Sequence, residues 1–335
     1  MAEVDLKYLA KVLNLSVSTV SRAINNCSDV NEDTRKRVLE LSRRLNYQPN
    51  AFGKILKYES SKTIGVIIPD IENSFFLAAI SGIENTAGQR GYHILVYLSH
   101  DSVEKEVEIT RRLLNGQVDG VLMSLSKHTT DISHLNTLYS RTPLVLFDRV
   151  SERSKACKVV TNNYESSYQA ATHLLLKGCR HILYLSSSEN LSTDKLRKEG
   201  LLQGISSSPD CICTSVVADR ESSAENALLI QSALLVENAP DAVFTSAEHL
   251  ALLCYEVCRK MNLRIPEDVK LISFSNSKFA CLYDPALTTL AQPAFEMGEE
   301  AARLLLALLS PGGLVGEEHT ICLPTVLTTR KSTGD

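Results

Sequence analysis

The sequence has 335 residues, of which 44% are hydrophobic and 22% are charged, and its formal net charge is −4. This length exceeds one ordinary domain and predicts two or three, and the apolar content allows a substantial buried core. No apolar run reaches the length of a membrane-spanning helix, and the first ten residues carry two acids and one lysine instead of a signal-peptide pattern. We therefore expect a cytoplasmic protein with no membrane partner.

The charge is distributed unevenly along the chain. Residues 1–60 contain 10 Lys or Arg and 7 Asp or Glu, which gives +3, whereas the remainder holds 25 against 32, which gives −7. A mildly basic head on an acidic body is consistent with a nucleic-acid contact at the N-terminus.

The nine cysteines are irregularly spaced and include no Cys-x-x-Cys pair. Cys254 and Cys258 are one helical turn apart, but no nearby His or Cys pair would complete a set of four metal ligands. We therefore predict reduced, mostly buried thiols and no metal site.

The N-terminal region predicts two short amphipathic helices joined by a tight turn. The first has an apolar stripe from Leu6 to Leu13 and ends at Asn14. Ser16 can cap the second helix, which buries Val20 and Ala23. The outer face of this second helix holds Val17, Ser18, Thr19, Ser21 and Arg22. Such a pair is typical of a helix-turn-helix, although the same spacing also occurs in ordinary helical bundles.

A third helix is predicted to begin after Asn31, which can cap it, and to bury Val38 and Leu41. It must end before Pro49, because proline interrupts a helix. The segment around Gly53 is too short to form a stable helix alone, and the polar residues that follow it predict a linker.

From Ile64 onward the pattern changes to alternating strands and helices. The predicted strands are apolar runs at 64–68, 94–98, 120–125, 144–147, 159–160, 182–185, 212–217, 242–244, 269–274 and 321–323. Helical periodicity separates them, most clearly at 76–87, 224–236, 250–261 and 295–309. This alternation predicts two successive α/β units, each an open parallel sheet with helices on both faces.

Several motifs match one known family in order and spacing. They are Val17–Asn25, Asn46–Asn50, Ile64–Ile71, Phe147–Arg149, Ile265–Val269, and Leu287–Thr289 with Gln292–Pro293. On these motifs the sequence resembles the Lac repressor family (LacI/GalR) of bacterial transcription regulators, over essentially its whole length.

The resemblance implies three regions. They are an all-α helix-turn-helix headpiece (1–48), a hinge helix with a linker (49–62), and a two-lobed core similar to periplasmic binding proteins (63–335). Lobe one would comprise about 63–161 and 292–323, and lobe two about 162–291 and 324–335. The family binds operator DNA as dimers under the control of small effectors in the cleft. We therefore expect a homodimeric repressor of a near-palindromic operator, with no cofactor.

The resemblance also implies roles for single residues at the DNA. Val17, Ser18 and Arg22 would read base edges in the major groove, with Arg22 making a bidentate contact to guanine. Contacts to phosphates would come from Thr19, Ser21, Tyr47 and Asn50. Leu56 would insert between base pairs in the minor groove and kink the duplex.

The effector is expected between the lobes, where open α/β sheets place ligands at the carboxyl ends of their strands. The predicted contacts are Asn73, Ser74, Phe75, Asp148, Arg149, Asn162, Arg197, Ser275 and Gln292. Phe75 offers an apolar face to a sugar ring, whereas Asp148 and Arg197 supply charged hydrogen bonds, which are stronger than neutral ones.

Three positions depart from the usual family pattern. Ser275 stands where an aspartate is common, Asn162-Asn163 replaces Asp-Asn, and Ala247-Glu248 replaces Asn-Asp. The cleft is therefore expected to hold fewer anions than is usual. This favours a carbohydrate or an acidic sugar derivative as the effector, with a purine as a further option.

Two other classes of function are considered. A two-lobed binding protein or sensor without operator binding would share the core, but the absent signal sequence and the headpiece count against it. An enzyme would need catalytic residues, and the sequence has no Gly-x-Ser-x-Gly, Walker-type or His-Glu-x-x-His motif. Ser186-Ser187-Ser188 follows a strand but lacks the glycines of a nucleophile turn. We predict no enzymatic activity.

Overall fold

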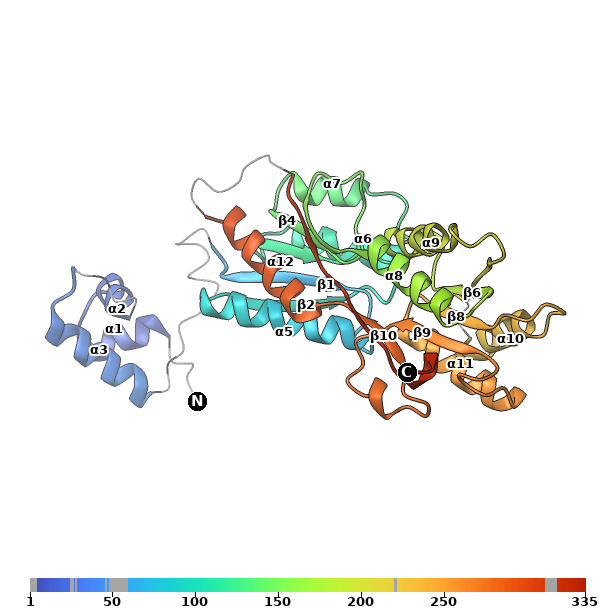
Figure 1. The fold of residues 1–335 in the computed structure, drawn as a ribbon. Coiled ribbons are helices and arrows are strands. Elements are labelled where there is room, and N and C mark those ends of the chain that lie inside the picture. The colour runs from blue at the N-terminus through green and yellow to red at the C-terminus, as the bar shows by residue number, and fades with distance from the viewer. Residues whose placement is uncertain are drawn as a thin grey trace. The chain divides into compact units, whose positions relative to one another are not determined.

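The computed structural model describes residues 5–24, 27, 29–45, 47, 60–219, 222–310 and 318–335 (Figure 1). The chain divides into two compact units, Met1–Ser61 and Lys62–Asp335, which we call the headpiece and the core unit. Asn50 and Leu56, for which DNA contacts are predicted, lie outside the described residues.

The described residues of the headpiece form three helices, α1 (Leu6–Leu13), α2 (Val17–Ile24) and α3 (Glu32–Arg44). Their ends follow local capping chemistry. Asn14 ends α1 in the left-handed conformation at φ 54°, Ser16 Oγ accepts a hydrogen bond from Thr19 N at 3.1 Å, and Asn31 Oδ1 accepts one from Asp33 N at 2.9 Å. The three helices enclose a small core of Leu9, Ala10, Val20, Ala23, Val30 and Val38.

The core unit contains two six-stranded sheets. The first sheet has the order β11-β5-β4-β3-β1-β2, and all of its strands are parallel. Its strands are β1 (Thr63–Ile68), β2 (His93–Leu98), β3 (Gly120–Met123), β4 (Leu144–Phe147), β5 (Cys157–Thr161) and β11 (Thr320–Leu323). Side chains on both faces of its central strands are buried, which explains why their sequences are continuous apolar runs.

Helices cover both faces of this sheet and complete lobe one. One face packs against α5 (Ser74–Gln89) and α12 (Ala294–Leu308), and the other packs against α6 (Val103–Leu113) and α7 (Ser133–Tyr139). The helix α12 therefore packs against a sheet in which the strands β1 to β5 are encoded more than 100 residues earlier.

The second sheet has the order β12-β10-β9-β8-β6-β7, in which only β12 is antiparallel to its neighbour. Its strands are β6 (His181–Ser186), β7 (Ile212–Val217), β8 (Ala242–Thr245), β9 (Lys270–Phe274), β10 (Thr288–Ala291) and β12 (Val326–Thr328). One face packs against α10 (Ser223–Leu234) and α11 (Glu248–Met261), and the other against α8 (Asn163–Leu176) and α9 (Ser192–Ile205). This sheet and its helices form lobe two.

The prediction of two α/β units with open, mainly parallel sheets is confirmed. The chain crosses between the lobes after β5, after β10 and between β11 and β12. The strand β12 was not predicted, because its three residues, with mostly exposed side chains, carry no strand signal of their own. The short helices η1 (Ala280–Leu282) and η2 (Lys331–Thr333) complete the described elements.

Candidate functional site

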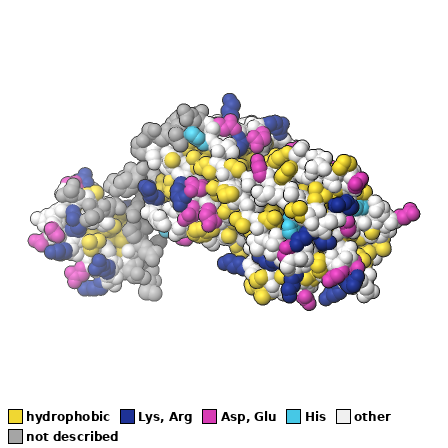
Figure 2. All heavy atoms as spheres, in the orientation of Figure 1, with side chains coloured by type: hydrophobic (Ala, Val, Ile, Leu, Met, Phe, Trp, Pro, Cys, Tyr) yellow, Lys and Arg dark blue, Asp and Glu magenta, His cyan; other side chains and the backbone are white. Residues whose placement is uncertain are grey.

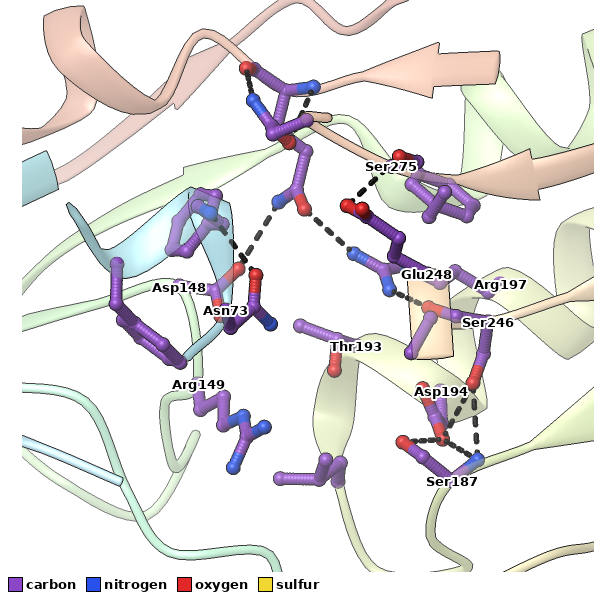
Figure 3. Close-up of a pocket in the computed structure, with 17 residues that line it drawn as sticks. Asn73, Asp148, Arg149, Ser187, Thr193, Asp194, Arg197, Ser246, Glu248 and Ser275 are labelled. Atoms are coloured by element: carbon purple, nitrogen blue, oxygen red, sulfur yellow. Dashed lines mark hydrogen bonds between the residues drawn. The ribbon is translucent and has the colours of Figure 1, made fainter. Parts of the chain in front are cut away.

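Polar side chains from several strand ends converge on one pocket between the two lobes (Figure 3). Lobe one contributes the segments that follow β1 and β4. Lobe two contributes those after β6, β8 and β9, and the crossover after β10 lies between them. Seven of the nine predicted effector residues line this pocket: Asn73, Phe75, Asp148, Arg149, Arg197, Ser275 and Gln292.

Arg197 forms the centre of the lobe-two wall and is only 6% exposed. Its Nε donates to Asn163 Oδ1 at 2.7 Å, and its Nη1 donates to the carbonyl oxygen of Ser246 at 2.5 Å. The guanidinium lies 3.7 Å from the centre of the Phe274 ring. Burial lowers the pKa of Arg197 against the opposing effect of nearby carboxylates, but an arginine remains charged at neutral pH.

Arg197 reaches Asn163 because α8 and α9 pack very closely. A Cβ atom at Gly200 would lie 2.1 Å from the carbonyl oxygen of Tyr164, and one at Gly204 would lie 2.5 Å from the Cβ of Ala171. Glycine is therefore required where the two helices meet, one turn beyond Arg197. This close contact between the backbones of α8 and α9 fixes the position of the Arg197 guanidinium in the pocket wall.

Gln292 connects the two lobes through its side-chain amide. Its Oε1 accepts a hydrogen bond from Arg197 Nη2 at 3.2 Å, and its Nε2 donates to Asp148 Oδ1 at 3.0 Å and to Thr161 Oγ1 at 3.1 Å. Asp148 has a positive φ of 57°, a conformation that L-residues other than Asn and Asp rarely adopt. This turn directs the Asp148 carboxylate towards the amide (Figure 3).

Asp194 shapes the pocket floor and was not predicted. Its Oδ2 accepts hydrogen bonds from the backbone amides of Ser187 and Ser188, both at 2.9 Å, and from the hydroxyl groups of Ser186, Ser187 and Ser246 at 2.8 to 3.2 Å. The serine run after β6 is therefore a carboxylate-binding loop. Its hydroxyl groups fix Asp194 at the start of α9 and have no nucleophilic arrangement.

Glu248 places a carboxylate in the cleft beside Ser275. Its Oε2 accepts hydrogen bonds from Ser275 Oγ at 2.9 Å and from Ser74 Oγ at 3.1 Å. The carboxylate thus occupies the space beside Ser275 and comes from the start of α11 (Figure 3). Sequence reasoning noted Glu248 as a departure but could not foresee that its longer side chain reaches β9.

The other two predicted residues lie outside this pocket lining. Ser74 borders the adjoining space and donates to Glu248 across the lobes. Asn162 Oδ1 accepts hydrogen bonds from Thr325 N at 2.7 Å and from Ser166 Oγ at 2.9 Å, so it joins two crossover segments. Its neighbour Asn163 makes the contact with Arg197 instead.

The pocket itself is small, with a volume of about 50 Å³. A volume of this kind has room for a few water molecules, since each needs about 10–15 Å³ of it. Hydrogen bonds between the lobes hold it in this form, including Ser188 Oγ to the Lys127 carbonyl at 3.1 Å and Ser192 Oγ to the Val150 carbonyl at 3.0 Å. A ligand larger than the pocket therefore requires these hydrogen bonds to break and the lobes to separate.

The exposed face of α2 is the candidate nucleic-acid surface of the headpiece. Val17, Ser18 and Arg22 are exposed, whereas Thr19 and Ser21 are half-buried. Arg22 Nη1 lies 3.2 Å from Asp29 Oδ2, and both side chains are 55% exposed. Tyr47 is half-buried and packs against the headpiece core, and burial raises the pKa of its hydroxyl.

Comparison with known proteins identifies the family. Residues 5–50 match the model for bacterial regulatory proteins of the lacI family, and residues 171–333 match that for a periplasmic binding protein-like domain. The HTH-type transcriptional regulator RegA of Clostridium saccharobutylicum is 30% identical over 339 residues, which cover 98% of this chain and 99% of RegA. The chain belongs to the lacI family of bacterial regulatory proteins.

Solved structures agree with this assignment. The Lac repressor dimer bound to operator and the anti-inducer ONPF has the same fold, with a TM-score of 0.85, 23% identity and coverage of 98% of this chain and 99% of that one. A LacI family regulator from Enterococcus faecium with bound ribose is 28% identical, with a TM-score of 0.67 and coverage of 81% and 98%.

This LacI-family chain is thus a DNA-binding transcriptional regulator with an effector-binding domain, and its family is not one of enzymes. Within the described residues, no group of three or more His, Cys, Asp or Glu side chains could hold a metal ion. No helix in the described part of the regulator is long and apolar enough to cross a membrane.

Proposed function

We propose that this regulator is a cytoplasmic repressor that binds a near-palindromic operator as a homodimer, with its affinity for DNA controlled by a carbohydrate or sugar derivative. One observation carries the effector class: hydrogen-bond donors and acceptors lie together in the wall of the interlobe pocket. Arg197 has N–H groups beyond its three bonds. Among the described residues, none forms a hydrogen bond with the second carboxylate oxygen of Asp148 or with the side-chain NH2 of Asn73.

A sugar matches this arrangement because each hydroxyl group both donates and accepts hydrogen bonds. Phe75 is buried at the same pocket, edge-on to Phe76 with ring centres 5.1 Å apart, and supplies the apolar surface that a sugar ring needs. A purine would need a flat slot at least as large as the one for a sugar. The guanidinium of Arg197 already covers the face of the Phe274 ring, so that face is not open to a purine. The ribose bound to the Enterococcus faecium relative supports the same class of ligand.

The headpiece is proposed to read DNA through α2. Val17 and Ser18 would contact base edges, and Arg22 would exchange its exposed ion pair with Asp29 for a bidentate contact to guanine. An exposed ion pair contributes little to stability, so this exchange costs little. Phosphate contacts are proposed for Thr19, Ser21, Tyr47 and Asn50, and insertion into the minor groove for Leu56.

Homodimerisation is proposed through the core unit. Large apolar side chains are exposed on α5, on α11 and around η1: Leu77 is 52% exposed, Leu252 45%, Phe279 67% and Leu282 75%. Figure 2 shows that hydrophobic side chains are spread over the visible face of the core unit among the charged ones. Burying such residues against a second copy would remove apolar surface from water. Two headpieces would then address two half-sites.

The proposal is tested by a thermal-shift screen of sugars, sugar acids and nucleobases, followed by operator titration with each ligand that raises the melting temperature. A ligand that binds only the folded state stabilises it. We expect at least one carbohydrate to stabilise the regulator and to change its operator affinity. Sequence-independent DNA binding that no sugar affects would instead favour the alternative of a two-lobed binding protein or sensor.

A further inference from the structure

A second space between the lobes adjoins the pocket and is rich in cationic side chains. It has a volume of about 490 Å³ and shares Arg149 and Leu191 with the pocket wall. Lobe one contributes Lys127, Arg149 and Arg153 to it, and lobe two contributes Lys195, against the single acid Glu152. We call this space the basic opening.

Two of these four cations have partners within the protein, and the other two are available to a ligand. Arg149 donates to Asp101 Oδ1 at 2.7 Å, and Arg153 donates to the carbonyl oxygen of Thr130. Within the described ranges, by contrast, no carboxylate lies within 4.0 Å of the ammonium groups of Lys127 or Lys195. The two lysines belong to different lobes.

The start of α9 adds to this positive potential. The helix begins at the basic opening with Leu191 in the capping position, and Leu191 offers no oxygen to the free amides of the first turn. Asp194 lies in that turn, but its Oδ2 is already used by the serines that follow β6. The free amides therefore favour an anion here, although they only add to the effect of the four cations.

The other side of the cleft has the opposite charge. A space of about 640 Å³ there is lined by six carboxylates and only two lysine or arginine side chains, Lys127 and Arg149. The carboxylates belong to Asp70, Glu72, Asp101, Asp219, Glu248 and Glu256. An anionic group that approaches the pocket is thus repelled at one side and attracted at the other.

We infer that the basic opening binds an anionic group of the phosphate type, either carried by the carbohydrate in the pocket or present as a free anion. The first form deepens the proposed function and rests on it, whereas the second does not require a sugar. Like charges on the two lobes repel each other while the opening is empty of anions. A phosphate between Lys127 and Lys195 removes this repulsion and favours the arrangement in which the lobes approach each other.

Calorimetric titration of the full chain with inorganic phosphate, at constant ionic strength, tests this inference. We expect saturable binding by the wild type. The variant Lys127→Ala/Lys195→Ala should bind at least about tenfold more weakly, and Lys195→Glu should lose binding as well, since each removes a charge that the anion contacts. Lys198→Ala is the matched control, because Lys198 is exposed on the same helix but does not line the opening. Headpiece cations are identical in all variants.

Paired titrations with glucose and glucose 6-phosphate, and with ribose and ribose 5-phosphate, identify the source of the anion. If a phosphate ester binds more tightly than both its parent sugar and inorganic phosphate, and if this gain in affinity is lost in Lys127→Ala/Lys195→Ala, the anionic group is carried by the effector. Phosphate binding that no ester exceeds shows a free anion. The inference is overturned if the wild type binds neither phosphate nor any ester above its parent, or if the double variant binds phosphate like the wild type. That result would leave the proposed binding of operator DNA standing, because operator binding is measured separately.

Discussion

Arg197 of α9 and Gln292 of the crossover after β10 are joined by a hydrogen bond of 3.2 Å, between Nη2 and Oε1. Gln292 also donates to Asp148 of lobe one, so a single amide side chain connects the cation of one lobe with the carboxylate of the other. The position of Arg197 in the pocket therefore depends on the relative position of the two lobes. An effector that displaces either partner would therefore change the position of Arg197.

Gln292→Ala is expected to destabilise the core unit and to weaken effector binding. It removes three buried hydrogen bonds and leaves Arg197 and Asp148 each without one partner. The loss of such partners costs about 1–3 kcal/mol. Urea unfolding followed by circular dichroism gives the change, with Gln203→Ala on the exposed side of α9 as the control. Equal stability of the two variants would show that the amide bridge is unimportant.

Gly200→Ala is expected to destabilise lobe two by about 1–3 kcal/mol, as overpacking generally does. The added methyl group would meet the carbonyl oxygen of Tyr164 at 2.1 Å and force α9 away from α8, which moves Arg197 from Asn163. Gly88→Ala on α5 is the matched control, because its methyl group meets only Glu84 Oε1 at 3.7 Å. That control should be neutral or gain up to about 1 kcal/mol. A stable Gly200→Ala protein would refute the close-packing argument.

Arg22→Ala is expected to weaken binding to the cognate operator by about 1–3 kcal/mol, the value of a bidentate contact to guanine. Binding to unrelated DNA should change far less, and the free headpiece should keep its stability, because the ion pair with Asp29 is exposed. Fluorescence anisotropy with both duplexes measures the difference. Arg37→Ala, an exposed position on α3, serves as the control. An equal loss on both duplexes would assign Arg22 to the phosphates.

Acidification is expected to destabilise the core unit partly through His173. Burial lowers the pKa of His173, and this effect exceeds the opposing one of the Asp335 carboxylate at 3.5 Å. As the pH falls, the unfolded chain therefore binds a proton at His173 before the folded chain does. The contribution of His173 is complete above its usual pKa of about 6.5 and is lost as the pH falls below it. The stability of His173→Gln should decline less than that of the wild type between about pH 7 and pH 5. The exposed His128→Gln variant should follow the wild type.

The sequence predicts the strand ends well, and with them the location of the pocket. Apolar runs mark β1, β4, β6, β8 and β9, and because parallel strands place their carboxyl ends together, the residues after them had to meet. Neither the roles of Asp194 and Glu248 nor the exclusion of Asn162 could be predicted in this way. These depend on side-chain lengths and on hydrogen bonds between residues distant in the sequence, such as Glu248 with Ser74.

Effector-controlled binding of a two-fold operator is tested most directly by selecting DNA from a pool of randomised duplexes with the full chain, and by titrating the enriched sequence. The predicted result is a sequence with two half-sites that are related by a two-fold axis and bound by two chains. A sugar from the thermal-shift screen should weaken or strengthen this binding. Enrichment of no common sequence, or of one half-site bound by a single chain whether or not a sugar is present, would contradict it.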